Sequence, residues 1–353
     1  MSEKIIYLNG SFVPESEAKV SVLDSGFNAG DGIYDVTRTF DHKLFRLREH
    51  TARLFRSLRY TRIDCGCTAD EMERATLELF ERNKPLLENG EEVAVWQVVS
   101  RGLRSSRGNR AAGKATVAIY CISIAFEEFA RQYVEGVKLV IPSTRRIPPQ
   151  CLEPKAKINN KMNHNMAIFE AKQVDPQAIP LMLDLDGNIS ESNAHNFFLV
   201  VNGKLCTPSN KNVLDGITKD ALFELATKLK IEVMDGNFTP YDAYNAEEAF
   251  LASTSPTLLP VQSINGVRPT KDVPGPVTKR LIQAWSDMVG VDIVMQALGH
   301  LDAAERDRLV AAWRVKTSAL YGCTRRRITF PTAHANGCFA SCTHRAASGQ
   351  STG

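Results

Sequence analysis

The stretch from Lys155 to Asn196 constrains the fold more than any other part of the chain. A lysine-rich loop precedes a segment that is expected to be a helix, and the apolar run 180–185 is typical of a strand. The sequence Asp186-Gly187-Asn188 predicts a turn after this strand. Glu191 comes just after the turn, so the pattern predicts mixed α/β structure with a lysine and a carboxylate at its connections.

A lysine in a pocket beside a buried carboxylate is the pair that a pyridoxal phosphate enzyme needs. The lysine forms a Schiff base with the cofactor, and the carboxylate keeps a proton on the pyridine nitrogen. The alternative is that both groups are solvated, as most lysines before helices and most acids after turns are. The residues alone leave both interpretations open, and they do not separate Lys155, Lys157 and Lys161.

The composition is that of an ordinary soluble globular chain with room for two domains. Of the 353 residues, 43% are apolar and 24% are charged, and the net charge is +3. This charge is too small to indicate nucleic acid, and no apolar run is long enough to span a membrane. Eight cysteines show no zinc-binding spacing, and no signal-peptide core is present, so we expect a cytoplasmic protein with reduced thiols and no metal.

The N-terminal third reads as strands followed by helices. A hairpin is predicted at Asn9-Gly10, and the alternation in residues 19–23 predicts a further strand. Thr68-Ala69-Asp70-Glu71 is a capping box, which predicts a helix to about Asn83. The other elements predicted here are a helix over 47–60 and strands over 92–99 and 115–122.

The remainder continues as mixed helix and strand. Gly216-Ile217-Thr218 is expected to open a helix, whose free N–H groups would form an anion site. Pro276 to Val289 reads as a late helix, and residues 300–320 as a further one. From Cys323 onward the chain has little periodicity, and we expect a partly disordered tail.

Several separated motifs, found in order over residues 4–295, resemble the fold-type IV pyridoxal phosphate enzymes. This group includes the branched-chain and D-amino acid aminotransferases, the (R)-selective amine transaminases and aminodeoxychorismate lyase. The motifs are Gly30-Asp31-Gly32-Ile33-Tyr34, Glu49-His50-Thr51-Ala52-Arg53-Leu54, Lys157 with Asn160, and Leu214-Asp215-Gly216-Ile217-Thr218. The resemblance implies a small N-terminal α/β domain (1–125), a linker (126–134), a larger pseudo-barrel domain (135–298) and an atypical tail (299–353).

The resemblance also implies the cofactor site. The K-x-x-N pattern selects Lys157 as the catalytic lysine, which leaves Lys155 in a flanking loop and Lys161 on the helix surface. Arg53 is expected to bind the cofactor phosphate, a role that suits its permanent charge and fork of donors. The residues expected to bind pyridoxal 5'-phosphate are Arg53, Glu191, Leu214, Ile217, Thr218 and Thr254.

Three residues are expected to shape the substrate pocket: Tyr34, Trp96 and Arg107. Arg107 matches the arginine that pairs with a keto acid carboxylate in the fungal (R)-amine transaminases. The chain departs from its relatives at three places. Trp96 replaces a glutamate of those transaminases, and Ser192 replaces the glycine after the family glutamate. Asn160 is followed by Lys161 and Met162, so the tyrosine of the Asn-Tyr pair of branched-chain enzymes is missing.

The resulting expectation is transamination through Lys157 from an (R)-amine or D-amino acid to a keto acid such as pyruvate. A branched-chain L-amino acid aminotransferase and an aminodeoxychorismate lyase-like enzyme are the alternatives. A binding protein that has kept only the fold is disfavoured by the presence of Lys157, Glu191 and Arg53. Family members are usually dimers, so we expect a homodimer that binds small molecules but neither nucleic acid nor membrane.

Overall fold

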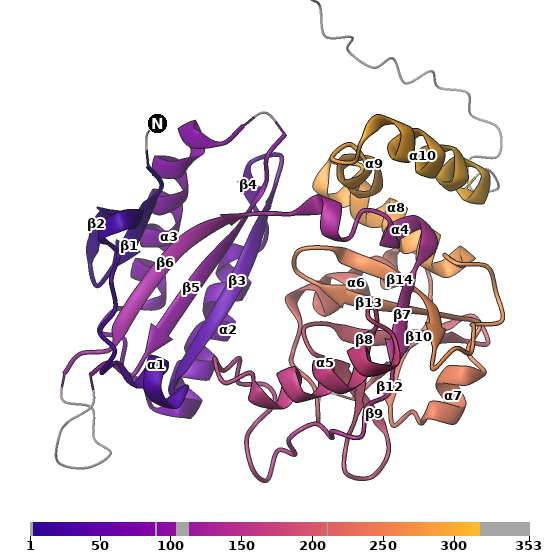
Figure 1. Ribbon diagram of the computed structural model, residues 1–353, viewed down its shortest axis with the longest axis horizontal. Helices are drawn as coiled ribbons and strands as arrows, with labels where there is room; N and C mark the ends of the chain where they lie inside the picture. Colours follow the sequence, from indigo (N-terminus) through magenta and orange to yellow (C-terminus); the bar gives the residue numbers. More distant parts are fainter. Residues whose placement is uncertain (1–2, 89, 104–112, 210, 318–353) are drawn as a thin grey trace, which may run out of the picture.

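A computed structural model describes residues 3–317 except 89, 104–112 and 210, and it divides into two lobes (Figure 1). The first lobe is built on a six-stranded antiparallel sheet in the order β2-β1-β6-β5-β3-β4. The second is built on an eight-stranded mixed sheet in the order β12-β11-β10-β13-β14-β7-β8-β9. The eight-stranded sheet curls until β9 contacts β10, so the expected two-domain fold with a pseudo-barrel is confirmed.

The small lobe follows the predicted order of elements, with one exception. Residues 19–23 form no strand, because no neighbouring strand in the described ranges pairs with them. Val20 and Val22 are accordingly 51% and 69% exposed. The hairpin at Asn9-Gly10 and the capping box at Thr68 are both present. The elements are β1 (Ile5–Leu8), β2 (Ser11–Pro14), η1 (Glu15–Glu17), α1 (Ser25–Ala29), β3 (Gly32–Phe40), β4 (Lys43–Leu44), α2 (Leu47–Thr61), α3 (Ala69–Asn83), η2 (Lys84–Leu86), β5 (Val93–Ser100) and β6 (Thr116–Ser123).

The two faces of strand β3 contact different lobes, because successive side chains of a strand point to opposite sides. Ile33 packs into the small-lobe core, and Asp35 contacts helix α2 on the same side. On the opposite side, Tyr34 lies near Lys157, and Phe40 enters the core of the large lobe. One strand therefore connects both lobes.

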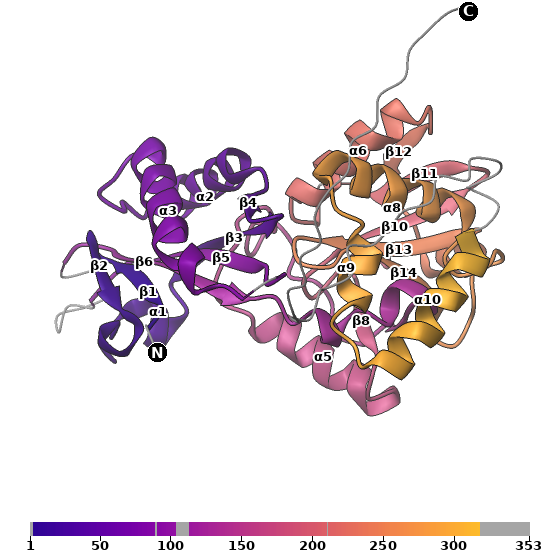
Figure 2. The same cartoon turned by 90° about the horizontal axis from the view of Figure 1, so that it is seen from above.

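The large lobe surrounds its curled sheet with helices, and Figure 2 shows α8, α9 and α10 together on one side of it. The connection from the small lobe runs through η3 (Phe126–Glu128) and α4 (Gln132–Glu135). The other elements are β7 (Val137–Val140), α5 (Met162–Val174), β8 (Ile179–Leu183), β9 (Ile189–Ser192), β10 (Asn196–Val201), β11 (Lys204–Pro208), α6 (Ile217–Lys228), β12 (Val233–Gly236), α7 (Pro240–Tyr244), β13 (Glu248–Ser253), β14 (Thr257–Ile264), α8 (Pro276–Val289), α9 (Ile293–Leu298) and α10 (Ala303–Thr317).

Aromatic packing and one buried arginine join the lobes. The ring centroids of Phe40 and Phe45 lie 6.4 and 5.3 Å from that of Trp285 on α8. The Arg38 guanidinium lies 3.9 Å from the Phe40 ring centroid and donates through Nη1 to the Ser255 carbonyl at 2.5 Å. The lobes are therefore held together by packed aromatic rings and this buried arginine.

Helix α10 packs onto the large lobe, although the expected tail was to begin at residue 299. Leu309 and Trp313 are 0% and 6% exposed and belong to the large-lobe core. The part of residues 300–320 that the structure describes is helical from Ala303 to Thr317, as predicted. Within the described ranges, no helix is both long and apolar enough to cross a membrane.

Replacing Trp313 by Ala should lower the free energy of unfolding by about 3–5 kcal/mol, because it removes a buried indole from this core. Val315→Ala is the matched control on the same helix, since Val315 is 75% exposed. Urea denaturation of both variants measures the difference. Equal midpoints for the two variants would contradict the packing of α10.

Candidate active site

One pocket is lined by all the residues expected to hold the cofactor, together with Lys157. They come from α2, the loop before α5, strand β9, the start of α6 and the end of β13. Residues far apart in sequence therefore meet at one place between the lobes. The members are Arg53, Lys157, Glu191, Leu214, Ile217, Thr218 and Thr254.

The backbone on both sides of Lys157 is fixed to the small lobe. Its carbonyl accepts a hydrogen bond from the Tyr34 N–H at 2.9 Å, and its N–H donates to Ser57 Oγ at 3.2 Å. The Asn159 N–H donates to the Gly32 carbonyl at 2.9 Å. The half-buried side chain brings Nζ to 4.7 Å from the Tyr34 ring centroid, inside the pocket.

The electrostatics of the pocket make the Lys157 amine easier to deprotonate than a free lysine. Burial lowers the pKa of Lys157 to about 8, and the positive charge of Arg53 contributes to this, although Asp35 and Glu191 oppose it. A substantial fraction of the amine is then unprotonated near neutral pH. An unprotonated amine is the form that attacks a carbonyl.

Arg53 is held rigidly at one end of the pocket. Its Nε and Nη2 donate to the two carboxylate oxygens of Asp35, each at 2.8 Å, and Nη1 donates to the Asp215 carbonyl at 2.8 Å. His50 Nδ1 lies 2.7 Å from the same carboxylate. Burial would raise the pKa of Asp35, but Arg53 and His50 lower it well below its usual range. The carboxylate is therefore ionised and orients the guanidinium.

The N-terminus of α6 lies beside Arg53. Gly216 is its N-cap, and no side chain caps the helix, so its first N–H groups are free of a side-chain acceptor. A side chain at Gly216 would collide with the amide oxygen of Asn196, which explains the glycine. A guanidinium and a helix N-terminus together form a site for a phosphate.

Glu191 lies at a different part of the pocket, on β9, and its carboxylate is held by three donors. Arg146 Nε donates to Oε1 at 3.1 Å, and the Leu214 N–H donates to Oε2 at 3.0 Å. Asn196 Nδ2 lies 3.4 Å from Oε2. Arg146 was not predicted as part of the site, and its sequence context, an Arg-Arg pair before two prolines, carries no signal for the role.

Two histidines complete the lining. The Nδ1 atoms of His164 and His195 are buried and have no hydrogen-bond partner among the described residues. Burial lowers their pKa values to about 3 and about 4, so both rings are neutral. Orphaned polar atoms in a pocket are satisfied when a polar ligand or water enters it.

The donor set fits pyridoxal phosphate. A cationic end formed by Arg53 and α6 suits the phosphate, and the carboxylate of Glu191 suits a protonated ring nitrogen. Lys157 supplies the amine for a covalent bond to the aldehyde.

The three predicted substrate residues differ in how the structure places them relative to Lys157. The rings of Tyr34 and Trp96 stack with centroids 5.2 Å apart, and Trp96 also stacks on Tyr120 at 6.1 Å. Tyr34 lies beside Lys157, with Nζ 4.7 Å from its ring centroid, although neither Tyr34 nor Trp96 is among the residues that line the pocket. Arg107 lies outside the described residues. The nearby Arg101 makes a bidentate pair with Asp31, with Nε 2.7 Å from Oδ2.

The expected position of Lys161 is wrong. Instead of lying on the helix surface, its Nζ lies 5.2 Å from the Tyr34 ring centroid, and the residue lines the pocket. Lys161 is the N-cap of α5, one position before the first helical turn. Side chains at this end of a helix point back along the helix axis toward the preceding loop, which here contains Lys157.

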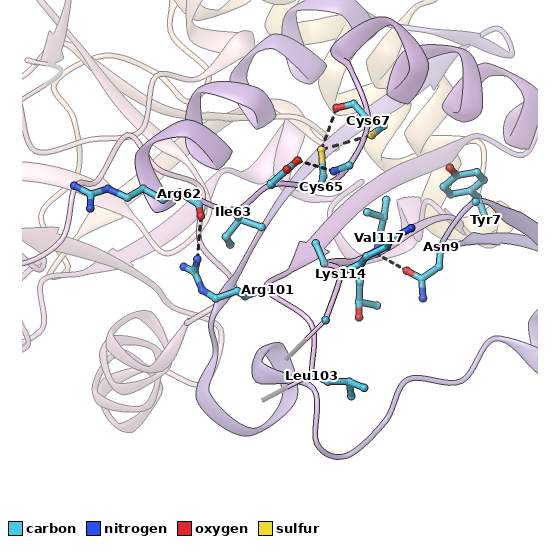
Figure 3. Close-up of a pocket in the computed structure, with 16 residues that line it drawn as sticks. Tyr7, Asn9, Arg62, Ile63, Cys65, Cys67, Arg101, Leu103, Lys114 and Val117 are labelled. Carbon is cyan, nitrogen blue, oxygen red and sulfur yellow. Dashed lines mark hydrogen bonds between the residues drawn. The ribbon is translucent and has the colours of Figure 1, made fainter. Parts of the chain in front are cut away.

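A larger cavity, about 1350 Å³, lies elsewhere, at the edge of the small-lobe sheet (Figure 3). Its lining includes Tyr7, Cys65, Cys67 and Arg101, and Figure 3 shows Arg101 bonded to the Arg62 carbonyl. The described residues of this lining include no paired lysine and carboxylate of the kind found around Lys157. The chemistry therefore belongs to the smaller pocket.

Comparison with known proteins agrees with this assignment. The family "Amino-transferase class IV" matches residues 32–264. A putative branched-chain-amino-acid aminotransferase of Methanocaldococcus jannaschii is 34% identical over 285 residues, which is 80% of this chain and 96% of that protein. The branched-chain-amino-acid aminotransferase of Escherichia coli K12 is 29% identical over 293 residues, 79% of this chain and 91% of that protein.

Solved structures give the same result. The Escherichia coli branched-chain amino acid aminotransferase superposes with a TM-score of 0.76 at 28% identity, covering 82% of this chain and 95% of that one. The branched-chain aminotransferase of the archaeon Thermoproteus uzoniensis, solved with norvaline, has a TM-score of 0.73 at 29% identity, covering 82% and 96%. The chain belongs to the class IV aminotransferase family, and it is a pyridoxal phosphate-dependent aminotransferase.

Proposed function

We propose that this aminotransferase acts on branched-chain L-amino acids and their keto acids. The observation that carries the proposal is the 34% identity to a putative branched-chain-amino-acid aminotransferase over nearly the whole length of that protein. A wall of aromatic rings supports it, because Tyr34 lies beside Lys157 and is itself stacked on Trp96. Such a wall suits an aliphatic side chain.

The comparisons favour this alternative over the first expectation, an (R)-amine or D-amino acid donor. The first expectation depended largely on Arg107, which lies outside the described residues. The missing tyrosine after Asn160, where Lys161 and Met162 follow instead, remains a departure from branched-chain enzymes. We therefore expect a substrate pocket that differs in detail from those of the relatives.

The proposed mechanism assigns one task to each group. When bound, pyridoxal phosphate supplies an aldehyde for covalent attachment and an electron sink. Lys157 Nζ would hold the cofactor through its aldehyde and, once free, would act as the general base that takes a proton from the donor carbon. Arg53 and the α6 N-terminus hold the phosphate, with Leu214, Ile217 and Thr254 around it. Glu191, held by Arg146, keeps the proton on the ring nitrogen.

The assembly and location are also proposals. We expect a homodimer, and the exposed apolar residues Val20, Val22, Leu23 and Phe27 of the small lobe offer a surface for it. We also expect a reducing cytoplasm. In support, the described cysteines Cys65, Cys67, Cys121, Cys151 and Cys206 are free thiols.

Mixing the cofactor-loaded enzyme with L-leucine should convert the absorbance band of the Lys157-bound cofactor, because the amino group is transferred in this half-reaction. D-alanine and (R)-1-phenylethylamine should leave the band unchanged. Stopped-flow absorbance measures each donor separately. Conversion by D-alanine or the (R)-amine, with none by L-leucine, would return the assignment to the first expectation.

Replacing Lys157 by Ala should abolish the covalent cofactor band and lower transfer by about a hundred- to ten-thousand-fold, the usual effect of losing a general base. Lys155→Ala is the control, since Lys155 is exposed in the same loop. Absorbance and steady-state assays measure both. A band that survives in Lys157→Ala would assign the covalent role to another lysine.

The rate at which the cofactor-free protein captures pyridoxal phosphate should rise with pH up to about 8 and then level off. The reason is that only the neutral amine attacks, and burial lowers the pKa of Lys157 to about 8. Free Nα-acetyl-lysine serves as the control, and its rate should keep rising toward its higher pKa. A protein profile that follows the free lysine would contradict the lowered pKa.

A further inference from the structure

Lys161 is a cation inside the pocket without a protein anion to match it. The arginines of the pocket are paired, Arg53 with Asp35 and Arg146 with Glu191. No described carboxylate lies within ion-pair distance of Lys161. The residues outside the described ranges contain no Asp or Glu, so they supply no side-chain carboxylate either.

The charges of the residues that line the pocket support the same conclusion, that Lys161 has no matching anion. Among the described lining residues, four carry a positive charge: Arg53, Arg146, Lys157 and Lys161. Glu191 is the single carboxylate there. Both lining histidines are neutral because burial lowers their pKa values. Asp35 balances the charge of Arg53 and Glu191 that of Arg146, which leaves Lys157 and Lys161 without an ion-pair partner among the described residues.

The position of Lys161 relates it to the reacting carbon. Lys157 Nζ and Lys161 Nζ lie 4.7 and 5.2 Å from the centroid of the same Tyr34 ring. A donor amine has to reach the place that Lys157 Nζ occupies, because it displaces this amine. Both lysines line this pocket, and the positive charge of Lys157 acts on Lys161, so a second group on the donor, a few bonds from the amine, faces a pocket that also holds Lys161.

The surroundings of Lys161 favour an anionic ligand. Burial lowers the pKa of Lys161, and the positive charge of Lys157 lowers it further, although Tyr34 partly opposes this. An arriving carboxylate would reverse the effect, because an opposite charge stabilises the ammonium. Tyr34 contributes a cation–π contact that holds the chain in place without neutralising it.

We propose that Lys161 is the specificity-determining residue that binds a carboxylate of the amino acid and keto acid substrates. The inference deepens the proposed function and rests on it for the identity of the substrate. The ligand chemistry is a carboxylate, which is either the α-carboxylate or a side-chain carboxylate of an acidic substrate. The residue acts by an ion pair, and no covalent step is assigned to it.

Binding of a non-reacting carboxylate tests this contact directly. Calorimetric titration of the cofactor-loaded enzyme compares 4-methylpentanoate with 4-methylpentanamide, which has the same carbon skeleton and no charge. The wild type should bind the carboxylate at least about tenfold more tightly, as a charged hydrogen bond permits. Lys161→Met should lose this preference, and Lys161→Arg should keep most of it. Lys155→Met, in an exposed position of the same loop, should match the wild type.

Kinetics then identify which carboxylate is bound. L-leucine, 3-methylbutylamine (leucine without its carboxylate) and L-glutamate serve as donors for the wild type and Lys161→Met. A rise of about tenfold or more in KM for L-leucine, with the amine unaffected, supports binding of the α-carboxylate. A rise for L-glutamate alone supports a side-chain carboxylate.

The inference is overturned if Lys161→Met keeps the wild-type preference for the carboxylate over the amide. Failure of the proposed function gives a different result. In that case the wild type does not react with L-leucine, while the calorimetric preference still depends on Lys161. The two failures are therefore distinguishable in the same set of proteins.

Discussion

The structure depends on the buried contact between Asp35 and Arg53. Both oxygens of the carboxylate are occupied, and the third donor of the guanidinium reaches the carbonyl of Asp215, just before α6. Burying two charges is favourable only when their hydrogen bonds are satisfied in this way. Ser57, one turn later on α2, donates to the Arg53 carbonyl and accepts from the Lys157 N–H. One helix of the small lobe therefore positions both the anion site and the reactive amine.

The pocket holds an anion site and a carboxylate at two separate places. Arg53 and the free N–H groups of α6 provide positive potential at one place, and Glu191 provides a carboxylate at another. Arg53 and Glu191 are buried, so each interaction is stronger than it would be at the surface. Burial also keeps His164 uncharged and makes the Lys157 amine easier to deprotonate. A prearranged field of this kind is what transfer of a proton at carbon requires.

The sequence predicted most of the fold and the residues that the structure brings together in the pocket. It could do so because each motif reflects what the local backbone requires. Gly216 is an example, since only glycine fits against Asn196. Contacts between distant segments were not predictable. The alternating pattern of residues 19–23 could not show that no neighbouring strand pairs with them. The orientation of the Lys161 side chain depends on Tyr34, which is far away in the chain. Asp35 could have been suggested by strand alternation together with the spacing of His50 and Arg53 on one helix face.

The length and register of strand β3 determine which lobe each of its side chains faces. Its even-numbered residues face the large lobe, from Tyr34 at the pocket to Phe40 in the core, and Asp35 faces α2. Deleting one residue within it would send the side chains on one side of the deletion to the wrong face. Deleting two would preserve the faces but move the pocket residues along the sheet by about 7 Å. A substitution within β3 therefore leaves the faces of the other residues unchanged, whereas a change in the length of the strand does not.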